Sequence, residues 1–272
     1  MIGPGPDRIA SAYLGDGIAN SEARAYFTAA GITDGTQRSA YDALVTALKG
    51  YSIYSKMFAL YPFLGGTASS HKWNAINPLD TDGAFRIVWN GTVTHSSNGV
   101  QGNGTTGYGD TKFVPSTSGF TTTSGSLGIY IRTNSAGAYD FSASNGAGSS
   151  SNAIIARYTG DNFFVGYGLL TAVANTDSRG FFCCVRNGAS NNEGFKNGTR
   201  VINAAAGAAL QTSTLTIGAD NRAGVYTEFS SRQYALAYIG QGMSTTEQAN
   251  LYTAVQAFQT ALGRNVSGWL HG

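Results

Sequence analysis

The chain has 272 residues, of which 12% are charged, and its formal net charge is +2. This balance excludes the clustered cations on which nucleic-acid binding depends, and no apolar run reaches the ~20 residues that cross a membrane. Hydrophobic residues make up 42% of the chain, enough for a sizeable core, so the low charge does not indicate disorder.

The first 63 residues differ in pattern from the rest of the chain. The opening stretch, MIGPGPDRIASAYLG, lacks the regions of a signal peptide. Asn20-Ser21 can cap a helix over 22–30, and apolar residues at helical spacing predict a second helix over 36–49. Two helices cannot hide all of this apolar surface, so we predict that residues 1–63 form an attachment or oligomerisation segment. The candidate contact residues are Tyr26, Phe27, Tyr41, Leu44 and Tyr51.

Short apolar runs separated by Gly, Asn and Ser then continue to about residue 242. They predict strands at 85–89, 108–113, 126–132, 139–144, 153–158, 163–167, 180–186, 193–196, 199–202, 213–217, 226–229 and 235–239. This pattern favours a mainly β sandwich over a fold of alternating strands and helices. The adjacent Cys183 and Cys184 would point to opposite faces of a strand, so we expect two free thiols and folding in a reducing cytosol.

The end of the chain predicts a helix over 244–263. Ser244 and Glu247 have the spacing of a capping box, in which each side chain binds the other residue's backbone N–H. Leu251, Val255 and Phe258 lie on one face, which we expect to cover the sandwich. Residues 267–272 form a short tail, for which an ordered strand and a frayed end are both left open.

Three consecutive strings carry a resemblance to known folds: FKNGTRV, LTIGADNRAG and YALAYIGQGMSTTEQ. An Asn-Gly hairpin, a short strand stopped by Gly, and a last strand followed by a capped helix resemble the closing part of concanavalin-A-like and laminin-G-like jelly rolls. The resemblance implies a jelly-roll domain over 64–266. Such domains mostly bind carbohydrate or protein.

Longer strings, at 27–74, 76–116, 175–182 and 238–266, resemble a group of bacteriophage structural proteins with a concanavalin-A-like domain. This resemblance implies a virion component made in the cytosol of an infected bacterium. A tail-fibre or receptor-binding module that contacts a host-surface glycan is favoured, and a capsid decoration or head-fibre protein is the alternative. The implied partners are other virion proteins and sister chains, with a trimer as the leading expectation.

The spacing of the acidic residues gives little support for an enzymatic function. Glucanases of this fold need paired carboxylates on one strand, and none of Glu22, Glu193, Glu228 and Glu247 has another carboxylate two or four residues away. We therefore expect a non-enzyme, with a glycan hydrolase as the less favoured alternative. The close pair Asp80 and Asp82 is interpreted as a turn. No cofactor is predicted, and calcium binding by loop residues (Asp110, Asp161, Asp220) is left open.

Aromatic residues beside polar ones are the candidates for glycan contact, because a sugar ring stacks its apolar face on an aromatic ring while polar side chains bind its hydroxyls. The candidates are Tyr130 with Arg132, Tyr139 with Asp140, and Arg157 and Tyr158 with Asp161 and Asn162.

Overall fold

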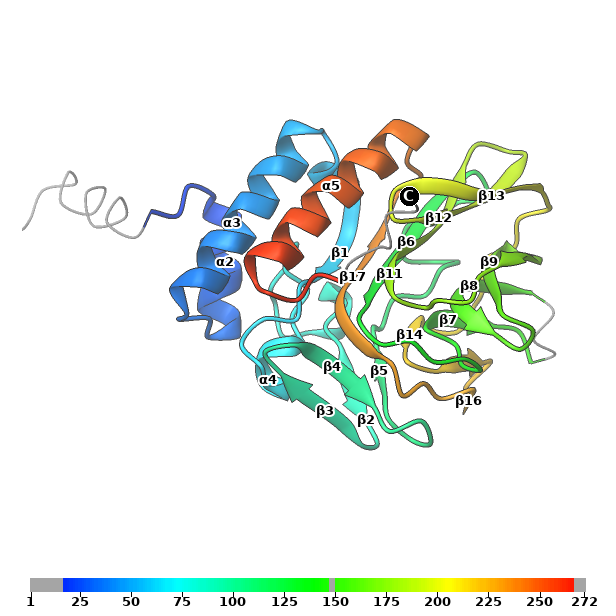
Figure 1. Ribbon diagram of the computed structural model, residues 1–272, viewed down its shortest axis with the longest axis horizontal. Coiled ribbons are helices and arrows are strands. Elements are labelled where there is room, and N and C mark those ends of the chain that lie inside the picture. Colours follow the sequence, from blue (N-terminus) through cyan, green and yellow to red (C-terminus); the bar gives the residue numbers. More distant parts are fainter. Residues whose placement is uncertain (1–16, 147–149, 267–272) are drawn as a thin grey trace, which may run out of the picture.

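The computed structural model describes residues 17–146 and 150–266, and it shows a mainly β domain in three layers (Figure 1). Two sheets form a sandwich, and a layer of helices covers the outer face of one of them. We call the covered sheet A and the other sheet B. The predicted fold class, a sandwich with an N-terminal helical segment and a C-terminal helix, is confirmed. The predicted tail at 267–272 lies outside the described residues.

Sheet A has the strand order β13-β12-β11-β6-β17-β4-β3, and β1 also pairs with β17. Its strands are β1 (Met57–Tyr61), β3 (Val93–Ser96), β4 (Gly99–Gly102), β6 (Ser124–Ile131), β11 (Gly180–Asn187), β12 (Asn191–Lys196), β13 (Thr199–Ala205) and β17 (Gln233–Gly240). The last strand in the sequence therefore lies inside the sheet, between β6 and β4.

Sheet B has the order β10-β9-β8-β7-β14-β5-β2, and the β15–β16 hairpin joins it through a parallel bridge between Arg222 and Ser144. Its strands are β2 (Val88–Asn90), β5 (Tyr108–Asp110), β7 (Phe141–Ser144), β8 (Ser151–Tyr158), β9 (Asn162–Gly168), β10 (Leu170–Ala174), β14 (Thr216–Ile217), β15 (Asp220–Arg222) and β16 (Val225–Thr227). The hairpin projects from the sheet and forms one wall of the candidate site.

Strand β11 separates two hydrophobic cores. Alternate side chains of a strand point to opposite faces, so Phe181 and Cys183 pack toward the helices while Phe182 and Cys184 pack between the sheets. Both thiols are free and buried, as predicted. Burial raises the pKa of Cys184 to about 12, so this thiol stays protonated at neutral pH.

The helical layer consists of α2 (Ser21–Ala30), α3 (Gly35–Gly50) and α5 (Thr245–Ala261) (Figure 1). The capping box of Ser244 and Glu247 at the start of α5 is present as predicted. The short elements are η1 (Tyr54–Lys56), α4 (Ala68–His71) and η2 (Asp82–Ala84). No helix in the described part of the chain is long and apolar enough to cross a membrane.

Asn20 precedes α2, but its side chain does not cap that helix as expected. The side-chain amide instead donates to Asp42 Oδ1 at 2.9 Å and to Thr46 Oγ1 at 2.8 Å. Asn20 therefore fixes α2 against α3.

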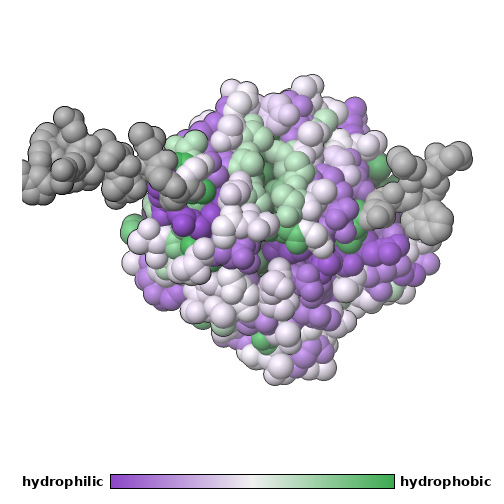
Figure 2. Space-filling view, turned by 60° about the vertical axis from the view of Figure 1, so that its left-hand side comes forward, coloured by the Kyte–Doolittle hydropathy of each residue, from purple (hydrophilic) through white to green (hydrophobic). Residues whose placement is uncertain are grey.

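The expectation that the N-terminal apolar side chains form an exposed surface is wrong for four of the five candidates. Tyr26, Phe27, Tyr41 and Leu44 are at most 4% exposed and share one core with sheet A and α5. The outer face of sheet A is itself apolar, so the helices bury these side chains against it. Tyr51 is 38% exposed. Figure 2, in which the helical side comes forward, shows mostly white and purple residues around one pale green area.

Candidate functional site

A cleft of about 430 Å³ opens beside the β15–β16 hairpin. It lies between β5, the segment that leads into β14, and the hairpin. The lining residues are Asp110, Thr212, Ser213, Thr214, Asn221, Ala223, Gly224 and Tyr226. They supply a carboxylate, hydroxyls, an amide and an aromatic ring, and the volume falls within the ~300–1,000 Å³ of small-molecule sites.

The carboxylate of Asp110 is bound by Lys112. Asp110 Oδ1 accepts a hydrogen bond from the backbone N of Lys112 at 2.9 Å, and Oδ2 accepts one from its Nζ at 2.8 Å. The hydrogen bond to Asp110 raises the pKa of Lys112, so the ammonium stays charged. Lys112 has a φ of 62°, which for a non-glycine residue is strained by ~1–3 kcal/mol. A carboxylate has about four acceptor positions, so Asp110 has acceptor capacity beyond these two bonds, although its side chain is only 8% exposed.

A row of hydroxyl side chains forms the opposite wall. Ser213 Oγ donates to the carbonyl of Asn221 at 3.1 Å, and Asn221 Nδ2 donates to Thr214 Oγ1 at 3.0 Å and to the Thr214 carbonyl at 2.9 Å. The backbone N of Gly224 donates to Asn221 Oδ1 at 2.8 Å. Asn221 therefore holds the hairpin tip. Thr214 Oγ1 accepts in this contact and keeps its own hydrogen for a ligand.

The aromatic surface of the cleft is Tyr226, whose ring stacks on Tyr108 with centroids 4.2 Å apart. Phe229 contacts Tyr108 at 6.1 Å. Burial, together with Tyr226, raises the pKa of Tyr108 to about 12, so the hydroxyl is protonated. Because Tyr108 stacks on one face of Tyr226 and is itself in contact with Phe229, the position of Tyr226 at the cleft is fixed before any ligand arrives.

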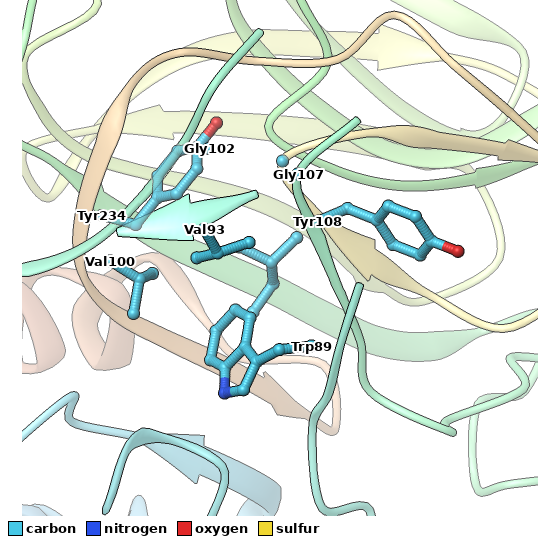
Figure 3. A pocket seen from close by; sticks show the side chains of 9 residues that line it. Trp89, Val93, Val100, Gly102, Gly107, Tyr108 and Tyr234 are labelled. Carbon is cyan, nitrogen blue, oxygen red and sulfur yellow. The ribbon is translucent and has the colours of Figure 1, made fainter. Parts of the chain in front are cut away.

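A second opening of about 10 Å³ lies behind Tyr108 and is lined by Trp89, Val93, Val100 and Tyr234 among others (Figure 3). Figure 3 shows the Tyr108 ring pointing away from it. This volume has room for about one water molecule, so we assign it no ligand.

The sequence-predicted residues Tyr139 and Tyr158 meet near the same hairpin, with ring centroids 5.7 Å apart. Tyr158 donates a hydrogen bond to Glu228 Oε2 at 3.0 Å, and the Arg222 guanidinium lies over the Tyr139 ring at 5.9 Å. Tyr139 is 5% exposed, so only the partly exposed Tyr158 offers a surface to a ligand.

Asp140 is a structural residue, and the expectation that it contacts a ligand is wrong. Its carboxylate is fully buried and lies 2.7 Å from Arg232 Nη1. It also accepts hydrogen bonds from the backbone N of Ala156 at 2.7 Å and from Tyr234 Oη at 2.9 Å. These partners occupy the carboxylate in the interior of the sandwich.

Arg157, Asp161 and Asn162 form a partly exposed group at the β8–β9 turn. Arg157 Nε donates to Asp161 Oδ1 at 2.7 Å, and Asn162 Nδ2 donates to the carbonyl of Gly160 at 3.0 Å. None of the three lines the cleft, and their role in binding stays a prediction.

Tyr130 and Arg132 bind the segment that follows α5. Tyr130 is fully buried on the face of sheet A that the helices cover; it donates to Gln256 Oε1 and accepts from the backbone N of Val266, both at 2.9 Å. Arg132 Nε donates to the carbonyl of Arg264 at 2.9 Å. The expectation of a ligand contact is therefore wrong for Tyr130, because α5 and the following segment cover it.

The acidic residues that the sequence singled out are paired with cations. Asp80 binds Lys72 and Arg86 at 2.6 and 2.8 Å, and Asp82 binds Arg86 at 3.1 Å, beside the turn that was predicted. The remaining acidic candidates each have a separate partner: Asp110 with Lys112, Asp161 with Arg157, and Asp220 with Arg222. Within residues 17–146 and 150–266, no group of three or more His, Cys, Asp or Glu could hold a metal ion.

Of the cleft residues, sequence reasoning singled out only Asp110, and only as a loop acid. It missed Tyr226, Tyr108, Lys112 and Thr214. The run Thr212-Ser213-Thr214 before a short strand was visible in the sequence, but nothing in it indicates that Asp110 lies opposite.

No family model and no curated protein matches the chain. Among solved structures, a mutant Trypanosoma rangeli sialidase displaying trans-sialidase activity is 10% identical, with a TM-score of 0.50, over 80% of this chain and 39% of that one. The same enzyme in complex with 2,3-difluorosialic acid is 9% identical, with a TM-score of 0.50, over 81% and 39%. Domain 4 of an extracellular arabinanase from Geobacillus stearothermophilus, in complex with arabinotriose, is 11% identical, with a TM-score of 0.47, over 72% and 98%.

The chain also matches the NanB sialidase of Streptococcus pneumoniae, of which it spans 24%. It therefore spans well under half the length of the sialidases that it matches. At identities of 9–10% the likeness to the Trypanosoma rangeli sialidase concerns the fold alone, which is a jelly-roll-like β-sandwich.

Proposed function

We propose that this domain is a non-enzymatic glycan-binding module and that the glycan lies in the cleft beside the β15–β16 hairpin. The observation that carries the proposal is that Tyr226, Asp110 and Thr214 line one open cleft of about 430 Å³. A sugar ring has an apolar face, which packs on an aromatic ring, and hydroxyls, which donate to a carboxylate and accept from a hydroxyl. The lining residues supply each of these partners.

The arrangement of the carboxylates favours binding over hydrolysis. Cleavage of a glycosidic bond by the common mechanism needs two carboxyl groups on either side of the bond, and Asp110 is the one carboxylate among the lining residues. Asp220 and Glu228 are near each other, since both bind Arg222, at 2.8 and 3.3 Å. The Asp220 carboxylate is fully buried and also accepts hydrogen bonds from Ser142 and Ser144. It therefore has no room for a substrate.

The biological setting that we propose is the particle of a tailed bacteriophage, with the domain in a tail fibre or receptor-binding protein. The sequence resemblance over residues 27–74, 76–116, 175–182 and 238–266 supports this setting. A capsid decoration or head-fibre protein is the alternative, and immunogold labelling of purified particles distinguishes the two locations.

Titration of the protein with purified polysaccharides tests the binding site. Tyr226→Ala should weaken binding at least about tenfold, the equivalent of ~1.4 kcal/mol, because it removes the stacking surface. The matched control is Tyr51→Ala, which removes a partly exposed tyrosine from the helical layer and should leave affinity unchanged. Equal affinities for all three proteins would place the glycan elsewhere, and release of new reducing ends would contradict the non-enzymatic assignment.

A further inference from the structure

The charges around the cleft restrict the class of glycan. This inference rests on the proposed function, because it concerns the same site. We infer that the cleft selects uncharged glycans and excludes acidic ones such as sialylated or uronate-containing polymers, and that the Asp110–Lys112 pair determines this selectivity.

The first step is the local charge balance. Among the described residues that line the cleft, Asp110 carries the only carboxylate, and the ammonium of Lys112, which is not one of the lining residues, lies 2.8 Å from its Oδ2. The side chains of Asp110 and Lys112 are 8% and 27% exposed, so solvent screens the carboxylate less than the ammonium. The two charges of the pair cancel, and the lysine has no net attraction left for a second anion.

The second step concerns the nearest arginine of the hairpin, Arg222. Asn221 and Tyr226 are cross-strand partners and both line the cleft, whereas the side chain of Arg222 does not line it. Arg222 Nε binds Asp220 at 2.8 Å, Nη2 binds Glu228 at 3.3 Å, and the guanidinium lies over the Tyr139 ring. Since Arg222 serves two carboxylates, it supplies no free cation to the site.

The third step concerns the free-energy cost of binding an anionic group in the cleft. A ligand carboxylate next to Asp110 would meet a like charge, and it would lose water without gaining the bidentate arginine that carboxylate recognition favours. The hydroxyls of Thr212 and Thr214, by contrast, suit the hydroxyls of an uncharged sugar. The cleft thus discriminates against acidic glycans, because their anionic groups would find no cationic partner in it.

The experiment compares two classes of polymer on the full chain. The uncharged probes are glucan, mannan, galactan and arabinan, and the acidic probes are polysialic acid and polyuronate. Binding is measured at about 0.05 and 0.5 M NaCl, because attraction between exposed charges weakens with salt and contacts of uncharged groups do not. We expect at least one uncharged polymer to bind with an affinity that changes less than about threefold with salt, and the acidic polymers to bind at least about tenfold more weakly.

A variant that removes one charge tests the role of the Asp110–Lys112 pair. Asp110→Asn keeps a similar shape but leaves Lys112 without its counter-charge, so acidic polymers should gain affinity at low salt and lose it at high salt. Asp177→Asn is the matched control, since Asp177 pairs with Arg179 two positions on, as Asp110 pairs with Lys112, and lies outside the cleft; it should leave the preference for uncharged polymers unchanged.

The outcomes separate the two proposals. A wild-type preference for acidic polymers that Tyr226→Ala abolishes would overturn the inference while the glycan site stands. An equal gain of acidic binding in Asp110→Asn and Asp177→Asn would also overturn it, because the effect would then follow from net charge. Failure of every polymer to bind would overturn both proposals.

Discussion

The guanidinium of Arg232 lies 2.7 Å from the carboxylate of Asp140, and neither side chain is exposed to solvent. Arg232 also donates to the carbonyls of Ser135 and Ala138. The pair thus joins the segment just before β17 of sheet A to the segment just before β7 of sheet B. Arg232 also supplies hydrogen bonds to these two backbone carbonyls.

Loss of one partner of this pair should be strongly destabilising. Asp140→Ala leaves a buried guanidinium without its counter-ion, for which the expected cost in unfolding free energy is ~3–5 kcal/mol. Urea denaturation followed by intrinsic fluorescence measures it. Asp161→Ala, which breaks the surface pair with Arg157, is the control and should cost ~0–1 kcal/mol. Similar losses in the two variants would contradict a special role for the buried pair.

Helix α5 should contribute to the stability of the whole domain. Leu251 and Phe258 are 1% and 2% exposed and belong to the core over sheet A. Truncation of either to Ala should cost ~2–5 kcal/mol, and Ser244→Ala, which removes the capping side chain, should cost ~1 kcal/mol. Thermal unfolding detects these losses, with the exposed Thr253→Ala as control. Unchanged melting temperatures would mean that α5 is not part of the cooperative unit.

The paired histidines His71 and His95 should make stability depend on pH. The backbone N of Gly66 donates to His71 Nε2 at 3.1 Å, so Nδ1 carries the proton and donates to His95 Nδ1, also at 3.1 Å. Burial, with a further contribution from His95, lowers the pKa of His71 to about 3. In the unfolded chain a histidine takes up its proton near pH ~6.5.

Between these two pH values the unfolded state binds more protons at this position than the folded state does. The stability contributed by neutral His71 is therefore present above pH ~6.5 and is lost as the pH falls toward 3. Unfolding free energies of the wild type and of His71→Gln, measured from pH 7 to 4, test this. The difference in favour of the wild type should shrink as the pH falls, and a constant difference would exclude the histidine as its source.

Removal of the N-terminal segment should unfold the domain. A shortened chain that begins at Leu64 lacks α2, α3 and β1, and it exposes the core that Tyr26, Tyr41 and Leu44 now fill. We expect aggregation and loss of a cooperative thermal transition. A chain that begins at Gly17 is the control and should unfold as the full chain does.

Light scattering on the full chain also measures its molar mass, which tests the expected trimer. A stable monomeric product from the Leu64 chain would show that the helices are dispensable, and would restore the interpretation of residues 1–63 as a separate attachment segment.

Much of the fold was predictable because its longest elements have strong periodic patterns. The capping residues and apolar face of α5 are local signals, and so are the continuous apolar runs of β6 and β11, which are buried on both faces. The β3–β4 hairpin was missed because its two loop residues are Ser97-Asn98, with Gly99 already in β4, and because strands of four polar-rich residues show little periodicity. Strand β10, LTAVA, was missed because alanine has a low preference for strands.

The site could not be predicted because its parts are distant in sequence. Asp110 and Thr214 belong to segments about a hundred residues apart that meet only when β5 pairs with β14. Likewise, Asp140 looked like a ligand residue beside Tyr139, and its partner Arg232 lies 92 positions away. Residue types indicated which side chains could bind a glycan. Whether such a side chain lies in the core or at the surface depended on strand pairing between distant segments, which the sequence does not show.

The position of β17 has a consequence for how the chain folds. β17 pairs with β6, β4 and β1. These three strands come earlier in the sequence, so sheet A cannot form completely until residues 233–240 have been synthesised. During synthesis, at ~5–20 residues per second, most of the chain has emerged from the ribosome before this strand exists. Such a high contact order implies slow folding. The unpaired edges of β1, β4 and β6 are then the places where a nascent chain would associate with another, and where a chaperone would act.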